Sequence, residues 1–105
     1  MAWIILVVAA LLEPVWAIAL ERSDGFKRLG PAALGVTAAA ASFVLLSFSL
    51  RQLPIGTAYA VWVGIGATCV AAVGIVALDE SASPLRLAFL GAIVVGVAGL
   101  RFLDA

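Results

Sequence analysis

Four long apolar segments, separated by short polar connections, constrain this chain more than any other feature of its sequence. A membrane-spanning helix needs about 17 to 25 predominantly apolar residues. Hydrophobic residues make up 66% of the chain and charged residues only 11%, whereas a soluble domain is about 45 to 50% apolar. We therefore predict an all-α membrane protein, a single domain with a four-transmembrane-helix bundle, whose helices cover about residues 2–20, 31–50, 55–78 and 84–103.

The connections are short enough to determine how neighbouring helices run. Residues 21–28 form a polar loop, residues 51–54 a tight turn, and residues 79–84 a second turn. Each helix should therefore run antiparallel to the one before it, with both termini on the same side of the membrane. The fourth helix is long enough only if Arg86 and Arg101 extend outward to the headgroups.

The basic residues give only a weak preference for orientation. The side that carries the termini has two basic residues, Arg51 and Arg101. The opposite side has four, which are Arg22, Lys27, Arg28 and Arg86. The positive-inside rule then places the termini outside by a small margin. Insertion in both orientations remains open.

Several classes of function are excluded by composition. His is absent and Cys69 is the only cysteine, so a disulfide within the chain is impossible and we expect no metal site and no cofactor. The net charge is zero without a basic stripe, so we expect no nucleic-acid partner. No nucleophile and base pair is present, and we do not expect an enzyme.

Glu13 lies within the first apolar segment and is the residue that needs a function. A charge at bilayer depth costs roughly 2.5 to 3.5 kcal/mol on insertion scales. No Lys or Arg lies at similar depth in any segment, and burial disfavours an ionised carboxylate without a partner. Glu13 therefore needs a proton or an external cation. Competition between the two for one carboxylate would couple their transport.

Other polar and aromatic side chains can complete a site around Glu13. Trp16 lies one helical turn away, Ser42 is in the second segment, and Tyr59 and Trp62 are three residues apart in the third. Each has a structural alternative. Ser42 could bond a carbonyl of its own helix, and the two aromatic residues could be anchors in the headgroup belt.

Proline and glycine indicate two places where the helices depart from regularity. Pro14 has no N–H, so it should kink the first helix and leave the carbonyl of Ala10 as a spare acceptor. Gly64 and Gly66 remove side-chain restraint in the middle of the third helix. We interpret them as a possible helix hinge.

Small residues recur every four positions in the fourth segment, at Ala88, Ala92 and Gly96. This spacing is typical of close contacts between membrane helices. We interpret the face as a dimer seam. The alternative is that these residues only let helices of one subunit approach each other.

Several motifs together resemble the small multidrug resistance transporters. They are the lone Glu13, Gly25-Phe26 with Arg28 and Pro31 beyond, Ser42-Phe43, and the stretch P-I-G-T-A-Y-A-V-W at residues 54–62. The resemblance covers almost the whole chain. Trp16-Ala17 is similar to the guanidinium exporter subtype.

The resemblance implies an antiparallel, dual-topology dimer in the cell's inner membrane, crossing it several times. It also implies proton-driven export by alternating access, in which Glu13 of both subunits exchanges protons for guanidinium or a related organic cation. The binding network it implies is Glu13, Trp16, Ser42, Tyr59 and Trp62. The partners expected are the substrate cation, protons, the lipid bilayer and a second copy of the chain.

Three alternatives remain. A broad-specificity quaternary ammonium or multidrug exporter of the same family would need a roomier apolar pocket. A heterodimer with a paralogue could replace the homodimer. A membrane subunit that does not transport could bind partner helices through the seam, although it would have no use for Glu13.

Overall fold

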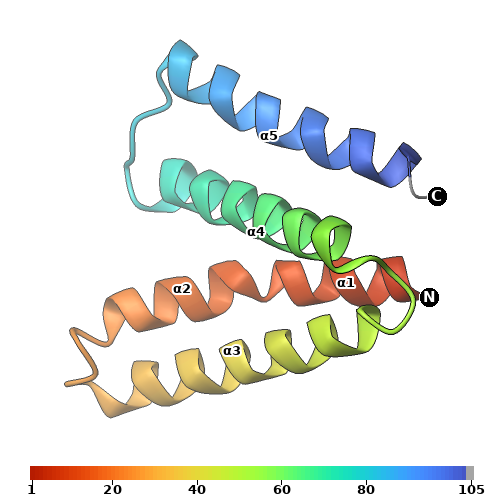
Figure 1. The fold of residues 1–105 in the computed structure, drawn as a ribbon. Coiled ribbons are helices and arrows are strands. Elements are labelled where there is room, and N and C mark those ends of the chain that lie inside the picture. Colours follow the sequence, from red (N-terminus) through yellow and green to blue (C-terminus); the bar gives the residue numbers. More distant parts are fainter. Residues whose placement is uncertain (104–105) are drawn as a thin grey trace.

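The computed structural model describes residues 1–103, which form helices joined by short loops (Figure 1). The helices are α1 (Ala2–Leu11), α2 (Glu13–Arg22), α3 (Leu29–Ser49), α4 (Ile55–Ala77) and α5 (Pro84–Leu103). Because α1 and α2 follow one another within the span Ala2–Arg22, the described residues contain 4 apolar helices long enough to cross a membrane. The predicted all-α fold with four membrane helices is confirmed.

The helices differ from the segments expected from the sequence by no more than two residues at either end. The first span continues past Leu20 to Arg22, and α3 begins at Leu29 rather than at Pro31. Charged side chains at helix ends can reach the headgroups, so a helix extends beyond its apolar part. Pro31 is tolerated because N–H groups in a first turn have no intrahelical partner.

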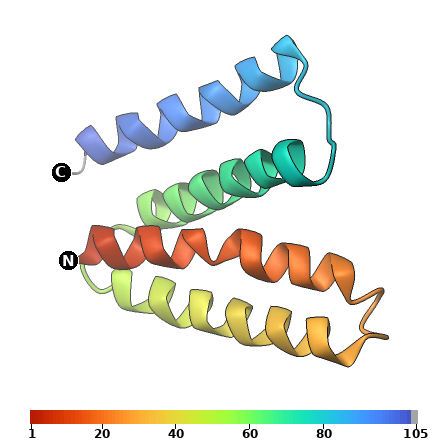
Figure 2. The same ribbon diagram turned by 180° about the vertical axis from the view of Figure 1, so that it is seen from behind.

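The first span lies at the centre of the bundle, between α3 on one side and α4 on the other (Figures 1 and 2). Both termini lie at the same end of the molecule (Figure 1). The core sits where α1, α3 and α4 meet, and its alanines let the helix axes approach closely. Its buried members are Leu6, Ala9, Ala10, Leu46, Ala58, Val61 and Trp62.

The last helix, α5, lies at the margin of the subunit beside α4. None of its described residues is buried. The contact with α4 depends on Gly64, because a Cβ there would lie 2.6 Å from Cγ2 of Val97.

The small-residue face of α5 points away from the other helices. Ala88 and Ala92 are exposed, and a Cβ built on Gly96 would have no neighbour within 4 Å. The alternative interpretation, in which Ala88, Ala92 and Gly96 let helices of one subunit approach, is therefore wrong. The face is available to a second subunit, and its role as a dimer seam stays a prediction.

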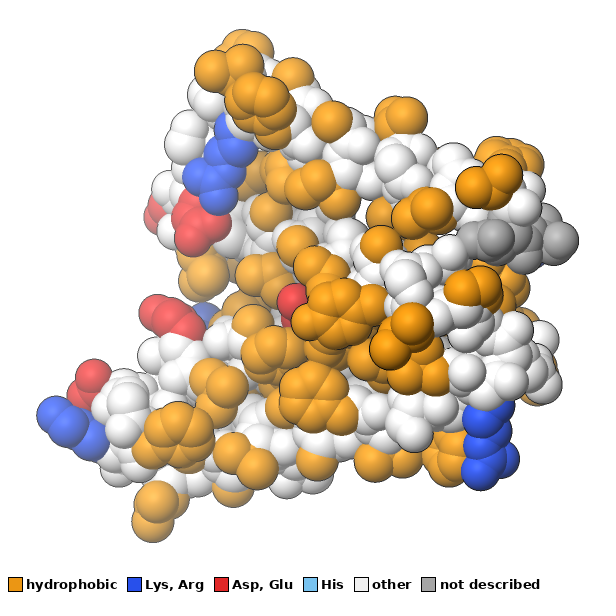
Figure 3. All heavy atoms as spheres, viewed as in Figure 1, with side chains coloured by type: hydrophobic (Ala, Val, Ile, Leu, Met, Phe, Trp, Pro, Cys, Tyr) orange, Lys and Arg blue, Asp and Glu red, His pale blue; other side chains and the backbone are white. Residues whose placement is uncertain are grey.

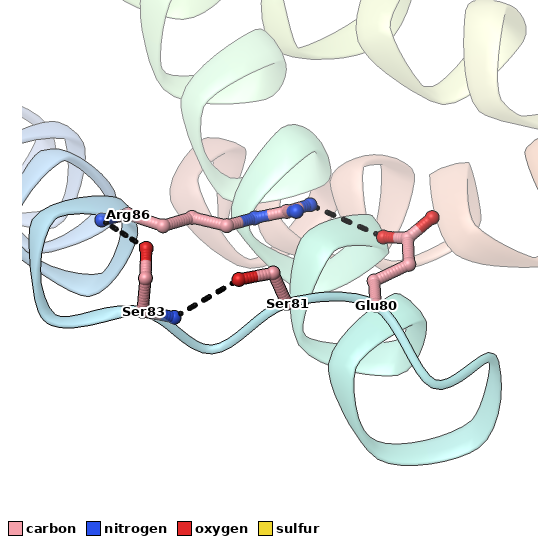
Figure 4. A network of polar contacts seen from close by, with 4 residues as sticks. All are labelled: Glu80, Ser81, Ser83 and Arg86. Carbon is pink, nitrogen blue, oxygen red and sulfur yellow. Dashed lines mark hydrogen bonds and ion pairs between the residues drawn. The ribbon is translucent and has the colours of Figure 1, made fainter.

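Polar side chains organise the loop between α4 and α5 (Figure 4). The Arg86 guanidinium lies 3.2 Å from Oε1 of Glu80. The backbone N–H of Arg86 donates to Oγ of Ser83 at 3.3 Å. Both charged side chains are partly exposed, so this ion pair contributes at most about 1 kcal/mol. Figure 3 shows charged side chains mainly at the helix ends and hydrophobic ones across the middle, as a membrane-spanning bundle requires.

Candidate substrate site

The first span is interrupted immediately before Glu13. The Leu12 N–H is shared between the carbonyls of Val8 and Ala9, at 3.3 Å each, and α2 begins at Glu13. Pro14 explains the interruption, since it cannot donate to the carbonyl one turn earlier and its ring crowds that carbonyl. The irregularity predicted at Pro14 is therefore present, and it makes Glu13 the first residue of a new helix.

The Glu13 side chain is packed against the backbone of α4. A Cβ built on Gly66 would overlap the Glu13 carboxylate and lie 3.0 Å from the Glu13 Cβ. The carboxylate can occupy this position only because Gly66 has no side chain. α4 continues as a helix through Gly64 and Gly66, and the hinge stays a prediction.

One carboxylate oxygen of Glu13 has no partner. Oε2 is buried and accepts no hydrogen bond from the described residues. Among those residues the only ion pair is the one in the α4–α5 loop between Glu80 and Arg86, so no cation of residues 1–103 neutralises Glu13. A buried polar atom without a partner is costly, so this oxygen is a free acceptor within residues 1–103.

Ser42 links α3 to both neighbouring helices. Its Oγ donates to the carbonyl of Ala9 at 2.7 Å, and Nε1 of Trp62 donates to the same Oγ at 3.0 Å. Ser42 thus bonds another helix, and the alternative of a bond to its own helix is wrong. The acceptor is the carbonyl of Ala9, and the role of the Ala10 carbonyl as a spare acceptor stays a prediction.

An aromatic row connects the three helices. Phe43 lies between Trp16, with ring centroids 6.5 Å apart, and Trp62, at 5.5 Å, and Tyr59 follows at 5.7 Å from Trp62. The rings are tilted by 45° to 52°, and their centroid separations lie within the range that aromatic pairs favour. The structure thus connects Trp16, Ser42, Tyr59 and Trp62 in one cluster, and Glu13 lies against α4 at Gly66, one helical turn from Trp62.

Phe43 was not among the site residues expected from the sequence. Its position after Ser42 was the only signal, and helical spacing does not separate it from the other phenylalanines. Phe43 is 52% exposed and Tyr59 55%, so the row forms an open side of the subunit. Nε1 of Trp16 is buried and has no partner among the described residues.

The arrangement suits a flat organic cation better than a metal ion. It combines an unpaired carboxylate oxygen with aromatic faces, which attract cations through their π-electrons. Within residues 1–103 no group of three or more His, Cys, Asp or Glu side chains could hold a metal.

Comparison with known proteins identifies the family. Residues 1–93 match the sequence profile described as Small Multidrug Resistance protein. The chain is 55% identical over 101 residues to the guanidinium exporter of Escherichia coli K12, covering 96% of each protein. The guanidinium exporters of Salmonella typhimurium LT2 and Citrobacter freundii are both 54% identical over the same share. The chain therefore belongs to the small multidrug resistance family and is a multi-pass transport protein of the bacterial inner membrane, not an enzyme.

Proposed function

We propose that the protein is a proton-coupled antiporter that exports guanidinium and small guanidinyl cations by alternating access. The observation that carries the proposal is the buried Oε2 of Glu13, which has no partner among the described residues. Relatives more than half identical over nearly the whole chain are named guanidinium exporters, and their names support the choice of substrate.

The chemistry of guanidinium fits the site. Its N–H groups lie in one plane and are arranged in pairs, which match the two oxygens of a carboxylate. The flat cation can also lie against an aromatic face, as an arginine side chain does. Glu13 would supply the carboxylate, and Trp16 and Trp62, linked through Phe43, would supply the faces. The bond from Trp62 to Ser42 would hold the indole in place.

Proton coupling follows from the use of one carboxylate for both ions. A partly buried carboxylate without a cationic neighbour is poorly stabilised when ionised, so it would be occupied by either a proton or the substrate. Because the two compete, release of the substrate to one side allows a proton to bind from that side. The site, with the proton bound, then reopens to the opposite side of the membrane, where the next substrate displaces the proton.

A second copy of the chain would complete the pathway. The aromatic row is open on one side of the subunit, and the exposed small residues of α5 offer a surface for another helix. Two oppositely inserted copies would place both Glu13 side chains in one shared site, and exchange of their conformations would open that site to each side in turn. The same surface would also accept a paralogue.

The test is transport by protein reconstituted in liposomes with an imposed pH gradient. We expect guanidinium to move against the proton flow, phenylguanidinium to follow more slowly, and tetraethylammonium to move little. Glu13→Gln should abolish coupled transport. Glu80→Gln is the matched control, because it makes the same change on an exposed acid in the α4–α5 loop (Figure 4).

Two outcomes would contradict the proposal in different ways. Unimpaired coupled transport by the Glu13→Gln variant would refute the role of the carboxylate. Tetraethylammonium transported faster than guanidinium, still dependent on Glu13, would favour a broad quaternary ammonium exporter instead. A quaternary ammonium ion has no N–H groups to donate to the carboxylate, so its binding would depend on the aromatic row alone.

A further inference from the structure

A second cavity lies outside the substrate site, between α1, α4 and α5. Its volume is about 330 Å³. Its walls are apolar except at one end, and they include Trp3, Val61, Ile65, Val94, Ala98 and Arg101. None of the described residues of α5 is buried, so the cavity is a groove open to the outside of the subunit. We refer to it as the α5 groove.

The groove runs from a helix end toward the middle of the membrane. Trp3 is in the first turn of α1 and Arg101 is in the last turn of α5, and both turns lie at the same end of the molecule (Figure 1). Ile65 and Val94 are near the middle of their helices. Trp and Arg at a helix end belong at the level of the headgroups, so the apolar part of the groove lies at the depth of the acyl chains.

Arg101 places a positive charge at the headgroup end of the groove. Its guanidinium carbon lies 4.8 Å from the centroid of the Trp3 ring. No acidic group within residues 1–103 forms an ion pair with it. A guanidinium stacked on an indole face keeps the N–H donors on its edge free, and these can receive an anionic group bidentately.

We propose that the α5 groove binds an anionic phospholipid, with one acyl chain in the apolar part and the phosphate on Arg101. The apolar part of the groove has no polar group to bind a polar ligand. The charge of Arg101 at the mouth selects a negatively charged headgroup. This inference does not depend on the proposed transport function.

The groove can be tested through the fluorescence of Trp3, which forms part of its wall. Trp16→Phe and Trp62→Phe together leave Trp3 as the only tryptophan. The protein is reconstituted in phosphatidylcholine vesicles that contain increasing fractions of either dibrominated phosphatidylglycerol or dibrominated phosphatidylcholine. We expect half-maximal quenching at about fivefold lower mole fraction of the brominated phosphatidylglycerol, the effect of one basic residue near an anionic surface.

Four variants test whether the headgroup preference arises in the groove. Arg101→Gln should remove it, whereas Arg101→Lys should keep most of it. Arg51→Gln is the matched control: Arg51 also lies over an aromatic ring, 5.3 Å from the centroid of Phe48, but it is not in the groove. This variant should quench like the parent protein. Ala98→Phe should fill the groove and reduce quenching by both brominated lipids.

Several results would overturn the proposal. Equal quenching by the two lipids would remove the headgroup preference, and loss of that preference in Arg51→Gln would make it a general surface effect. Competition by inorganic phosphate at millimolar concentration would indicate an anion site without an acyl chain. Protection of Trp3 from both lipids would show that a second copy of the chain covers the groove. If Arg101→Gln does not insert, Arg101→Lys and Ala98→Phe still decide the question.

Discussion

Replacement of Gly66 by alanine is the sharpest structural test of the Glu13 site. A Cβ at position 66 would overlap the carboxylate and lie 3.0 Å from the Glu13 Cβ. Rotation of the carboxylate can relieve the first contact. It cannot relieve the second, because the Cβ atom is fixed to the backbone of α2. The substitution therefore has to separate α2 from α4.

The magnitude follows from the cost of overpacking. An extra methyl group in a well-packed interior costs about 1 to 3 kcal/mol. If this cost falls on the arrangement that binds substrate, the affinity for guanidinium should decrease by about fivefold to about a hundredfold. Gly30→Ala is the matched control, since a Cβ there has no neighbour within 4 Å and the residue lies outside the α5 surface proposed for a second subunit. It should leave affinity unchanged.

A double-mutant cycle distinguishes a loss of affinity caused by the contact between position 66 and Glu13 from a loss caused by a stiffened hinge in α4. Glu13→Asp draws the carboxylate back and removes its overlap with the added methyl group but keeps the Cβ contact, so the loss caused by Gly66→Ala should be smaller in the Glu13→Asp background without disappearing. Affinity is measured by isothermal titration of guanidinium into the solubilised protein. Wild-type affinity in Gly66→Ala would refute the packing argument. Equal losses in both backgrounds would favour the hinge over the contact.

Three further predictions concern the rest of the site. Ser42→Ala leaves the Trp62 indole N–H buried without its acceptor, so the free energy of unfolding measured in SDS should decrease by about 1 to 3 kcal/mol. Ser49→Ala is the control and should change this free energy much less, because the Ser49 hydroxyl donates to the Leu46 carbonyl of its own helix. Because protons and guanidinium compete for Glu13, the apparent Kd in a titration series should rise by about tenfold per unit decrease of pH once the carboxylate is protonated, and a Kd independent of pH would contradict competition. Trp16→Gly should lose the preference for guanidinium over tetraethylammonium in the transport assay, and unchanged selectivity would exclude a role for the indole.

The fold was predictable because bilayer thickness fixes the length of a membrane helix. Apolar runs and charged connections located the four spans to within two residues, and Pro14 indicated the irregularity in the first of them. Whether the small residues of α5 pack within the subunit was not predictable from spacing. That depends on how far α5 stands from the other helices, which the sequence pattern does not encode.

The grouping of the candidate site residues was predictable, but their contacts were not. Position along each helix and the resemblance to a family selected Trp16, Ser42, Tyr59 and Trp62 as neighbours of Glu13. Neither indicated that the Ser42 hydroxyl bonds Ala9 in α1. Such contacts depend on the rotation of each helix about its axis, which is set by packing across the bundle.

Gly66 and Phe43 illustrate the same limit. Gly66 was expected as a hinge, and its contact with Glu13 appears only when α2 and α4 are placed side by side. Phe43 connects Trp16 to Trp62, although nothing in the period of its helix separates it from the other phenylalanines.

The most direct test of the central claim is proton release on substrate binding. Guanidinium is added to the solubilised, weakly buffered protein at a pH where Glu13 is protonated, and the change in pH is recorded. The wild-type protein should release protons in a saturable manner. Glu13→Gln should release none, while Glu80→Gln should behave as the wild type does. Proton release that persists in Glu13→Gln would contradict the exchange of protons for substrate at this carboxylate.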